Sequence, residues 1–224
     1  MCGRFSLFAN PLDFMSEFEI DQLPFDWNPR YNIAPGQMIP AVIADGGKRR
    51  AGQLRWGLVP SWAKDEKIGY KMINARAETL QEKPAFRRLF EKKRCIIPAD
   101  GFYEWKQLDK GKQPMRITLK DDGLFAFAGL FDTWTSPAGE NVHSCTIITT
   151  KPNELVAEIH DRMPVILKKE DVGTWLDRER YDTDLLQSLL VPYDAEQMMA
   201  YPVASTVNSP KNDLPECIEE VPWQ

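Results

Sequence analysis

A hairpin signal near the start of the chain constrains the fold more than any other feature. Residues 39–44 and 49–59 are apolar and prone to β-structure, and the turn-forming segment Asp45-Gly46-Gly47 lies between them. Further short strands are predicted downstream, near residues 94–98, 101–107, 114–119, 124–130 and 143–149. The middle of the chain is therefore rich in β-structure.

Helical patterns flank these strands. Asn10 and Pro11, a helix-capping residue and a first-turn proline, precede an amphipathic pattern that extends to Phe18. Residues 24–35 are punctuated by prolines and are predicted to form a loop. Further helices are predicted over residues 84–92, 152–159, 169–177 and 183–190.

The domain organisation follows from the length and from what the chain lacks. Its 224 residues contain no internal repeat, no low-complexity segment and no linker long enough to separate two domains. We therefore expect one α+β domain over residues 1–224, with a mostly antiparallel, barrel-like β-sheet flanked by helices.

Cysteine usage and missing motifs exclude several classes of protein. The four cysteines form no C-x-x-C pair, so neither a zinc ribbon nor a thioredoxin-type redox motif is available. Patterns of serine hydrolases, zinc proteases and nucleotide-binding loops are also missing. We expect no metal and no cofactor. Cys95 and Cys145 lie in apolar runs and are predicted to be small buried hydrophobic residues.

The sequence shows neither a membrane-span candidate nor a signal-peptide pattern. No apolar run approaches the roughly 20 residues that a membrane span needs, so we expect no membrane association. Residues 1–5, Met-Cys-Gly-Arg-Phe, lack the charged leader and apolar stretch of a signal peptide. A cytoplasmic location is the expectation.

The charge distribution is uneven. The net charge of -5 argues against a nucleic-acid partner, but residues 46–94 hold 14 basic and five acidic side chains, a net charge of +9. This block also contains Trp56, Trp62, Asn74 and Arg76. It is either a solvated face or a platform that stacks bases of a single strand. Trp56 is expected in the core, whereas Trp62 fits either role.

Cys2 is a candidate nucleophile. Met1 precedes a small side chain and is expected to be removed, which would leave an N-terminal cysteine. Such a residue carries a thiol and an α-amine on adjacent carbons, and the amine, with an ordinary pKa of roughly 7.7–8.0, is partly neutral and nucleophilic at working pH. The alternative is an incidental cysteine at a frayed terminus.

Other polar residues sit in strand-like or loop segments suited to chemistry. Glu104 alternates with two aromatic residues, where a carboxylate would have a raised pKa and could exchange protons; a cross-strand ion pair is the alternative. Asn74 and Arg76 share a side in an extended segment and could bind a sugar-phosphate; loop stabilisation and a surface ion pair are their alternatives. His160 precedes a proline-ended loop and fits proton transfer or a structural role. Asn32 is similarly embedded in an apolar run.

Six segments, in order, carry a resemblance to a known family. Together they resemble the SRAP family (SOS response-associated peptidase, or abasic site processing protein), in a bacterial or phage-type form, over residues 2–208, with residues 209–224 as a C-terminal tail. The segments are MCGRF (1–5), RYNIAPG (30–36), WGLVPSW (56–62), NARAET (74–79), RCIIPADGFYEWK (94–106) and IHDRMP (159–164).

The resemblance implies a function and a set of roles. It implies that the protein senses abasic sites in single-stranded DNA and forms a covalent thiazolidine crosslink through Cys2. By similarity, Glu104 assists proton transfer and release of Met1, Asn74 positions the deoxyribose, and His160 moves protons. Phosphate contacts are implied for Arg4, Arg76 and Arg162, and a base-turning edge for Trp62. The resemblance also implies lyase and autoproteolytic activities, a monomer, and association with the nucleoid or replication fork.

Two rivals remain. Glutamine amidotransferases of the N-terminal-nucleophile class also begin Met-Cys-Gly and use that cysteine with its own α-amine as base. A non-catalytic module that binds single-stranded DNA would leave Cys2 incidental.

Overall fold

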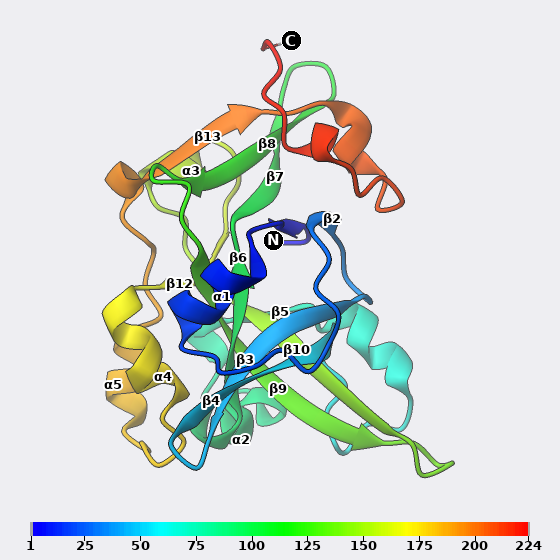
Figure 1. The fold of residues 1–224 in the computed structure, drawn as a ribbon, viewed down its shortest axis with the longest axis vertical. Helices are drawn as coiled ribbons and strands as arrows, with labels where there is room; N and C mark the ends of the chain where they lie inside the picture. The colour runs from blue at the N-terminus through cyan, green and yellow to red at the C-terminus, as the bar shows by residue number, and fades with distance from the viewer. Residues whose placement is uncertain (1, 224) are drawn as a thin grey trace.

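Five strands close into a β-barrel in the computed structural model, which describes residues 2–223 (Figure 1). Around the barrel the neighbours follow the order β10, β4, β3, β6, β9 and back to β10. The β10–β4 pair is parallel and the other pairs are antiparallel. The barrel strands are β3 (Met38–Asp45), β4 (Lys48–Trp56), β6 (Arg94–Ala99), β9 (Phe125–Thr135) and β10 (Asn141–Thr150).

Three short strands extend the barrel at its rim. β5 (Asn74–Arg76) runs parallel to β10, and β11 (Met163–Pro164) pairs with the end of β10. β12 (Ile166–Leu167) pairs with β9. Strand β10 therefore carries segments from distant parts of the chain on its two sides.

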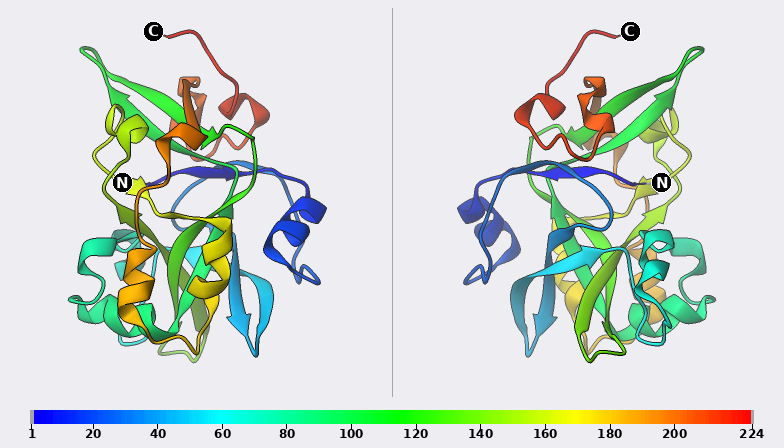
Figure 2. Two further views of the ribbon diagram at one scale, coloured as in Figure 1. Left: turned by 90° about the vertical axis from the view of Figure 1, so that its left-hand side faces the viewer. Right: turned by 90° about the vertical axis from the view of Figure 1, so that its right-hand side faces the viewer.

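A second, fully antiparallel sheet lies at one end of the barrel (Figure 2). Its order is β13-β8-β7-β1-β2. Only Asp100 separates β6 from β7, so one stretch of chain passes from the barrel into this sheet. The strands are β1 (Phe5–Leu7), β2 (Arg30–Ile33), β7 (Gly101–Gln107), β8 (Lys112–Leu119) and β13 (Met198–Pro202).

Helices cover the barrel on several sides (Figure 1). The Asn10 side chain accepts a hydrogen bond from the Leu12 N–H at 2.8 Å, and the helix that follows buries Phe14 and Phe18, as its sequence predicts. The helices are α1 (Pro11–Phe18), α2 (Pro84–Lys92), α3 (Glu154–Ala157), α4 (Val172–Leu176) and α5 (Thr183–Ser188). Short 3₁₀ helices are Glu66–Lys71, Ala77–Thr79, Lys169–Asp171, Ala195–Gln197, Ser205–Asn208 and Pro215–Cys217.

Two apolar clusters form the main core. One packs α1, α2, α4 and α5 against the barrel and includes Phe90 and Trp175. The other fills the barrel and extends to Phe5 and Leu7 of β1. It includes Cys95 and Cys145, which are fully buried as predicted. Burial of this apolar surface is the main favourable contribution to folding.

The predicted α+β architecture with a mostly antiparallel barrel is confirmed, and β3 and β4 form the expected hairpin. The prediction of a loop over residues 24–35 is wrong in part, because β2 lies within it. Residues after 208 pack against the second sheet, and Cys217 is fully buried. The extent of a single domain over residues 1–224 stays a prediction. Within residues 2–223, no helix is long and apolar enough to cross a membrane.

Candidate functional site

Strand pairing brings the segment that carries Cys2 next to β7, the strand that carries Glu104. In the antiparallel β1–β7 pair, Phe5 lies opposite Phe102 and Ser6 opposite Gly101. The ladder continues where the Tyr103 N–H donates to the Arg4 carbonyl at 3.0 Å. Cys2 lies two residues before Arg4, and its thiol is close enough to the Glu104 carboxylate to be affected by that charge.

The Cys2 side chain is enclosed by apolar neighbours. It is fully buried in the cluster that also contains Trp56, Cys145 and Ile147. Burial raises the pKa of the Cys2 thiol well above its usual range, and the nearby Glu104 carboxylate raises it further. The thiol is therefore protonated in this state, and its use as a nucleophile requires a group that accepts the proton.

Glu104 and His160 form a pair of titratable groups. The Glu104 side chain is 3% exposed, and burial raises its pKa to about 8, as its aromatic surroundings in the sequence predict. Its Oε2 lies 3.8 Å from His160 Nε2. Burial lowers the pKa of His160. At pH 7 the pair is therefore a neutral carboxylic acid beside a neutral imidazole, a combination that suits acid and base roles.

The contacts at Nδ1 fix the orientation of the His160 ring. His160 follows α3 and precedes β11, which pairs with β10 where Met163 lies opposite Thr150. The Arg162 N–H lies 3.1 Å and the Arg162 carbonyl oxygen 3.3 Å from His160 Nδ1, while Nε2 faces Glu104. Asp161 Oδ1 lies 3.0 Å from the same Nδ1 and stabilises a protonated ring. The surroundings thus support both protonation states.

Asn74 and Arg76 lie on β5, on the other side of β10. Asn74 is opposite Ile147, and its Nδ2 donates to the Ile147 carbonyl at 3.4 Å. Its Oδ1 is buried and accepts no hydrogen bond from residues 2–223. A buried acceptor of this kind is costly unless a ligand donates to it. Arg76 is opposite Thr149 and its side chain is exposed.

Arg162 is bound by protein groups in this structure. Its two terminal nitrogens donate to the two carboxylate oxygens of Glu78 at 2.8 and 2.9 Å, and one of them also donates to the Thr149 carbonyl at 2.8 Å. The Arg162 guanidinium lowers the pKa of Glu78. A phosphate that contacts Arg162 would have to replace Glu78, since the fork geometry suits either anion.

Arg4 and Trp62 lie in different surroundings. The Arg4 guanidinium donates to Asn32 Oδ1 at 2.8 Å and to the Val207 carbonyl at 2.5 Å. Trp62 is 61% exposed on the turn after β4, whereas Trp56 is fully buried as predicted. The structure therefore groups Cys2 with Glu104 and His160 and leaves Trp62 on the surface.

Glu78 and Thr149, the partners of Arg162, are not among the residues predicted from the sequence. A signal for Glu78 exists, because residues 74, 76 and 78 alternate in one motif. No comparable local signal marks Thr149, which meets Arg162 only through the pairing of β11 with β10. Within residues 2–223 no group of three His, Cys, Asp or Glu side chains is arranged to hold a metal ion.

Comparison with known proteins assigns the chain to a family. The family described as SOS response associated peptidase (SRAP) matches residues 1–210. The chain is 62% identical over 222 residues to the abasic site processing protein YoqW of Bacillus subtilis (strain 168), across 98% of this chain and 99% of that protein. The chain therefore belongs to the SRAP family.

More distant relatives agree with this assignment. The chain is 36% identical over 224 residues to the abasic site processing protein HMCES of Gallus gallus, across 86% of this chain and 66% of that protein. A crystal structure of a protein from Bacteroides thetaiotaomicron matches with a TM-score of 0.89 and 31% identity, across 98% of this chain and 100% of that one. The barrel and the second sheet are thus shared with a protein of known structure.

Proposed function

We propose that this protein processes abasic sites in single-stranded DNA by bonding to them covalently through Cys2. The observation that carries the proposal is the enclosed Cys2 thiol near a pair of titratable groups, Glu104 and His160. The pKa of Glu104 is raised and that of His160 is lowered. Family membership and the names of the relatives also support abasic sites as the lesion that the protein processes.

The reaction proceeds in two steps once Met1 is removed. The free Cys2 amine adds to the aldehyde carbon C1′ of the ring-opened deoxyribose, and the resulting carbinolamine loses water to give an imine. The Cys2 sulfur then adds to C1′, its proton leaves, and the nitrogen gains a proton. One water is released and a five-membered thiazolidine forms. The second step is fast because both groups belong to one residue.

Glu104 and His160 move the protons. Glu104 is largely protonated at pH 7, so it donates to the departing hydroxyl group of the carbinolamine and then accepts the thiol proton. His160 is neutral and takes the C1′ hydroxyl proton while the deoxyribose ring opens and O4′ takes up another. The same two groups transfer protons when the crosslink is reversed. Glu104 also assists cleavage of the Met1–Cys2 bond, and β-elimination at the imine supplies a lyase activity.

The remaining predicted residues bind the DNA. Asn74 Oδ1 accepts a hydrogen bond from a deoxyribose hydroxyl, because it is buried and accepts none from residues 2–223. Arg76 and Arg162 contact phosphates, the latter by exchanging Glu78 for a phosphate. Arg4 presents its more exposed nitrogen, and Trp62 provides a stacking edge. The protein acts as a cytoplasmic monomer at damaged replication forks.

Intact-mass analysis with single-stranded DNA that carries one abasic site tests the proposal. The wild-type chain is expected to lose Met1 and to gain the mass of the DNA minus one water, with the adduct mapped to Cys2. Cys2→Ala should abolish the stable adduct, because the thiazolidine requires the sulfur, and should keep weak, salt-sensitive DNA binding. Cys95→Ala, which removes another buried thiol of the same cluster, is the control and should still react. An unchanged wild-type mass refutes the proposal, and glutamine hydrolysis would favour the amidotransferase alternative.

A further inference from the structure

Asn32 is a buried polar residue that the proposed chemistry does not use. Its side-chain nitrogen donates to the carbonyls of Val207, Ser209 and Asn212 at 3.1, 3.0 and 2.6 Å, and its Oδ1 accepts from Arg4. Two N–H hydrogens thus serve three acceptors, so the amide is saturated. Asn32 is fully buried. It ties β2 to residues 203–213, which we call the C-terminal clamp.

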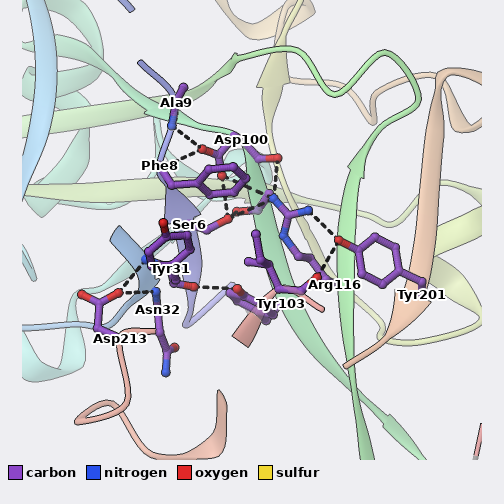
Figure 3. A network of polar contacts seen from close by, with 12 residues as sticks. Ser6, Phe8, Ala9, Tyr31, Asn32, Asp100, Tyr103, Arg116, Tyr201 and Asp213 are labelled. Atoms are coloured by element: carbon purple, nitrogen blue, oxygen red, sulfur yellow. Dashed lines mark hydrogen bonds and ion pairs between the residues drawn. The ribbon is translucent and has the colours of Figure 1, made fainter. Parts of the chain in front are cut away.

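Asp213 closes the clamp from its other end (Figure 3). Its carboxylate accepts from the backbone N–H groups of Tyr31 and Asn32 at 2.5 and 2.9 Å and also binds the Arg30 guanidinium. β2 is the edge strand of the second sheet. Its outer N–H groups would otherwise be unpaired, and the clamp satisfies them with a side chain more than 180 positions away in sequence.

The clamp also contacts both residues that flank the site. The Val207 carbonyl accepts from Arg4 at 2.5 Å, and Asn208 Oδ1 accepts from the Trp105 indole N–H at 2.7 Å. The Arg4 guanidinium lies over the Trp105 ring, 5.6 Å from its centroid. Arg4 is two residues from Cys2, and Trp105 follows Glu104 directly. The clamp therefore holds the arm that carries Cys2 against the strand that carries Glu104.

From these contacts we propose that Asn32 is a positioning residue for Cys2, acting through Arg4 and the C-terminal clamp. β1 has only three residues in its ladder, which is too little to fix the chain that precedes it. Reacting groups must be held closely, since a displacement of about 1 Å can cost about 100-fold in rate. This inference rests on the proposed function, because the rate it concerns is that of adduct formation at Cys2.

The alternative is that Asn32 contributes only to the stability of the fold. Gln113 provides the control for this. It is also buried, and its side-chain nitrogen donates to the carbonyls of Val203 and Pro114, both at 2.9 Å. It thus anchors the start of the same clamp to β8, away from Arg4. Asn32→Asp keeps an acceptor for Arg4 and removes both donors to the clamp, while Gln113→Leu removes the anchor on β8.

The test compares wild type, Asn32→Asp and Gln113→Leu, with Asp213→Asn as the milder variant if Asn32→Asp does not fold. For each we would measure the adduct rate constant at saturating abasic single-stranded DNA and the affinity for the unreactive tetrahydrofuran analogue. Asn32→Asp should slow the adduct by about 10- to 100-fold with affinity within about twofold. Asp213→Asn should slow it about threefold to tenfold, and Gln113→Leu should react at about the wild-type rate.

A second readout separates the inference from the proposed function. Iodoacetamide alkylation of Cys2, located by peptide mass, needs no DNA. The enclosed wild-type thiol should react slowly, Asn32→Asp at least about 10-fold faster, and Gln113→Leu like wild type. If the three chains are alkylated at these relative rates but wild type forms no adduct with abasic DNA, the proposed function is refuted and the positioning role of Asn32 is not. Equal alkylation in wild type and Asn32→Asp, or equal acceleration in Gln113→Leu, overturns the positioning role.

Discussion

The barrel and the second sheet are built by different means. On the face of the barrel that the helices cover, side chains such as Val42, Ile96, Leu130 and Ile148 are fully buried and apolar. The second sheet instead buries a network of polar and charged groups, among them Asp100 and Arg116, at 5% and 4% exposure. Apolar packing is non-directional, whereas hydrogen bonds and ion pairs specify angle and register. The barrel therefore supplies stability and the sheet supplies position.

The Asp100 network shows how the sheet fixes β1 (Figure 3). The Ser6 hydroxyl donates to Asp100 Oδ1 at 2.7 Å, and the Phe8 and Ala9 N–H groups donate to Oδ2 at 2.5 and 3.1 Å. Arg116 pairs with the same carboxylate at 3.4 Å and donates to the Tyr201 hydroxyl at 2.7 Å. Asp100 thus holds the C-terminal end of β1, and Arg116 of β8 and Tyr201 of β13 hold Asp100 in turn.

The largest effect is expected when this network is broken. Asp100→Ala leaves the buried Arg116 charge uncompensated and should cost about 3–5 kcal/mol of unfolding free energy. Leu130→Ala, in the barrel, should cost a similar 2–5 kcal/mol through its cavity. Urea unfolding measures both. Adduct formation by the folded fraction should slow only in Asp100→Ala, and equal slowing in Leu130→Ala would remove the distinction between the two regions.

The second prediction concerns the carboxyl group within the site. Glu104→Gln keeps the shape of the side chain and cannot donate an acid proton, so the adduct rate should fall by about 100-fold or more. In wild type the rate should decline as pH rises through about 8, because Glu104 loses its proton there. Rates at saturating DNA between pH 6 and 9 provide the measurement. A decline of the same shape in Glu104→Gln would assign that titration to another group.

The same substitution tests stability against pH. The Glu104 pKa is about 8 in the folded chain and near its ordinary value of 4.5 when unfolded. Its contribution to stability is therefore complete below pH 4.5 and is lost as pH rises to about 8. Relative to wild type, Glu104→Gln should gain roughly 4 kcal/mol between those limits. Parallel unfolding free energies across this range would contradict the burial of an ionisable carboxyl.

The smallest effect is expected at Glu78, where the site meets solvent. Glu78→Gln removes the anion that occupies the Arg162 fork, so affinity for undamaged single-stranded DNA should rise about twofold to fivefold, the range of an exposed ion pair. Fluorescence anisotropy at two salt concentrations measures it. Glu82→Gln, an exposed change of the same charge in the same segment, is the control. A fall in affinity would show that Glu78 orients Arg162 instead of competing with DNA.

Much of this architecture could be predicted from local sequence patterns. The hairpin at Asp45-Gly46-Gly47, the capped first helix and the carboxyl group of Glu104 between two aromatic residues all have signals within a few residues. β1 could not be predicted, since three residues are too few for a periodicity.

Contacts between distant segments could not be predicted. Prolines around β2 obscured a strand that depends on Asp213 for its edge, and the role of Asn32 depends on carbonyls 175 to 180 positions away. Sequence patterns named Arg162 but not Glu78 as its partner, because that pair forms only when β5 and β11 flank β10.

The contact between Arg4 and Val207 has a consequence for the order of events during synthesis. It joins residues 203 positions apart, so the arm that carries Cys2 gains this last attachment only when the chain is almost complete. At roughly 5–20 residues per second, this contact forms about 10–40 s after Arg4 is made. Cleavage of the Met1–Cys2 bond with the help of Glu104 requires the assembled site, so it follows completion of the chain. Contact between the two ends of the chain thus makes a reactive Cys2 a late product of synthesis.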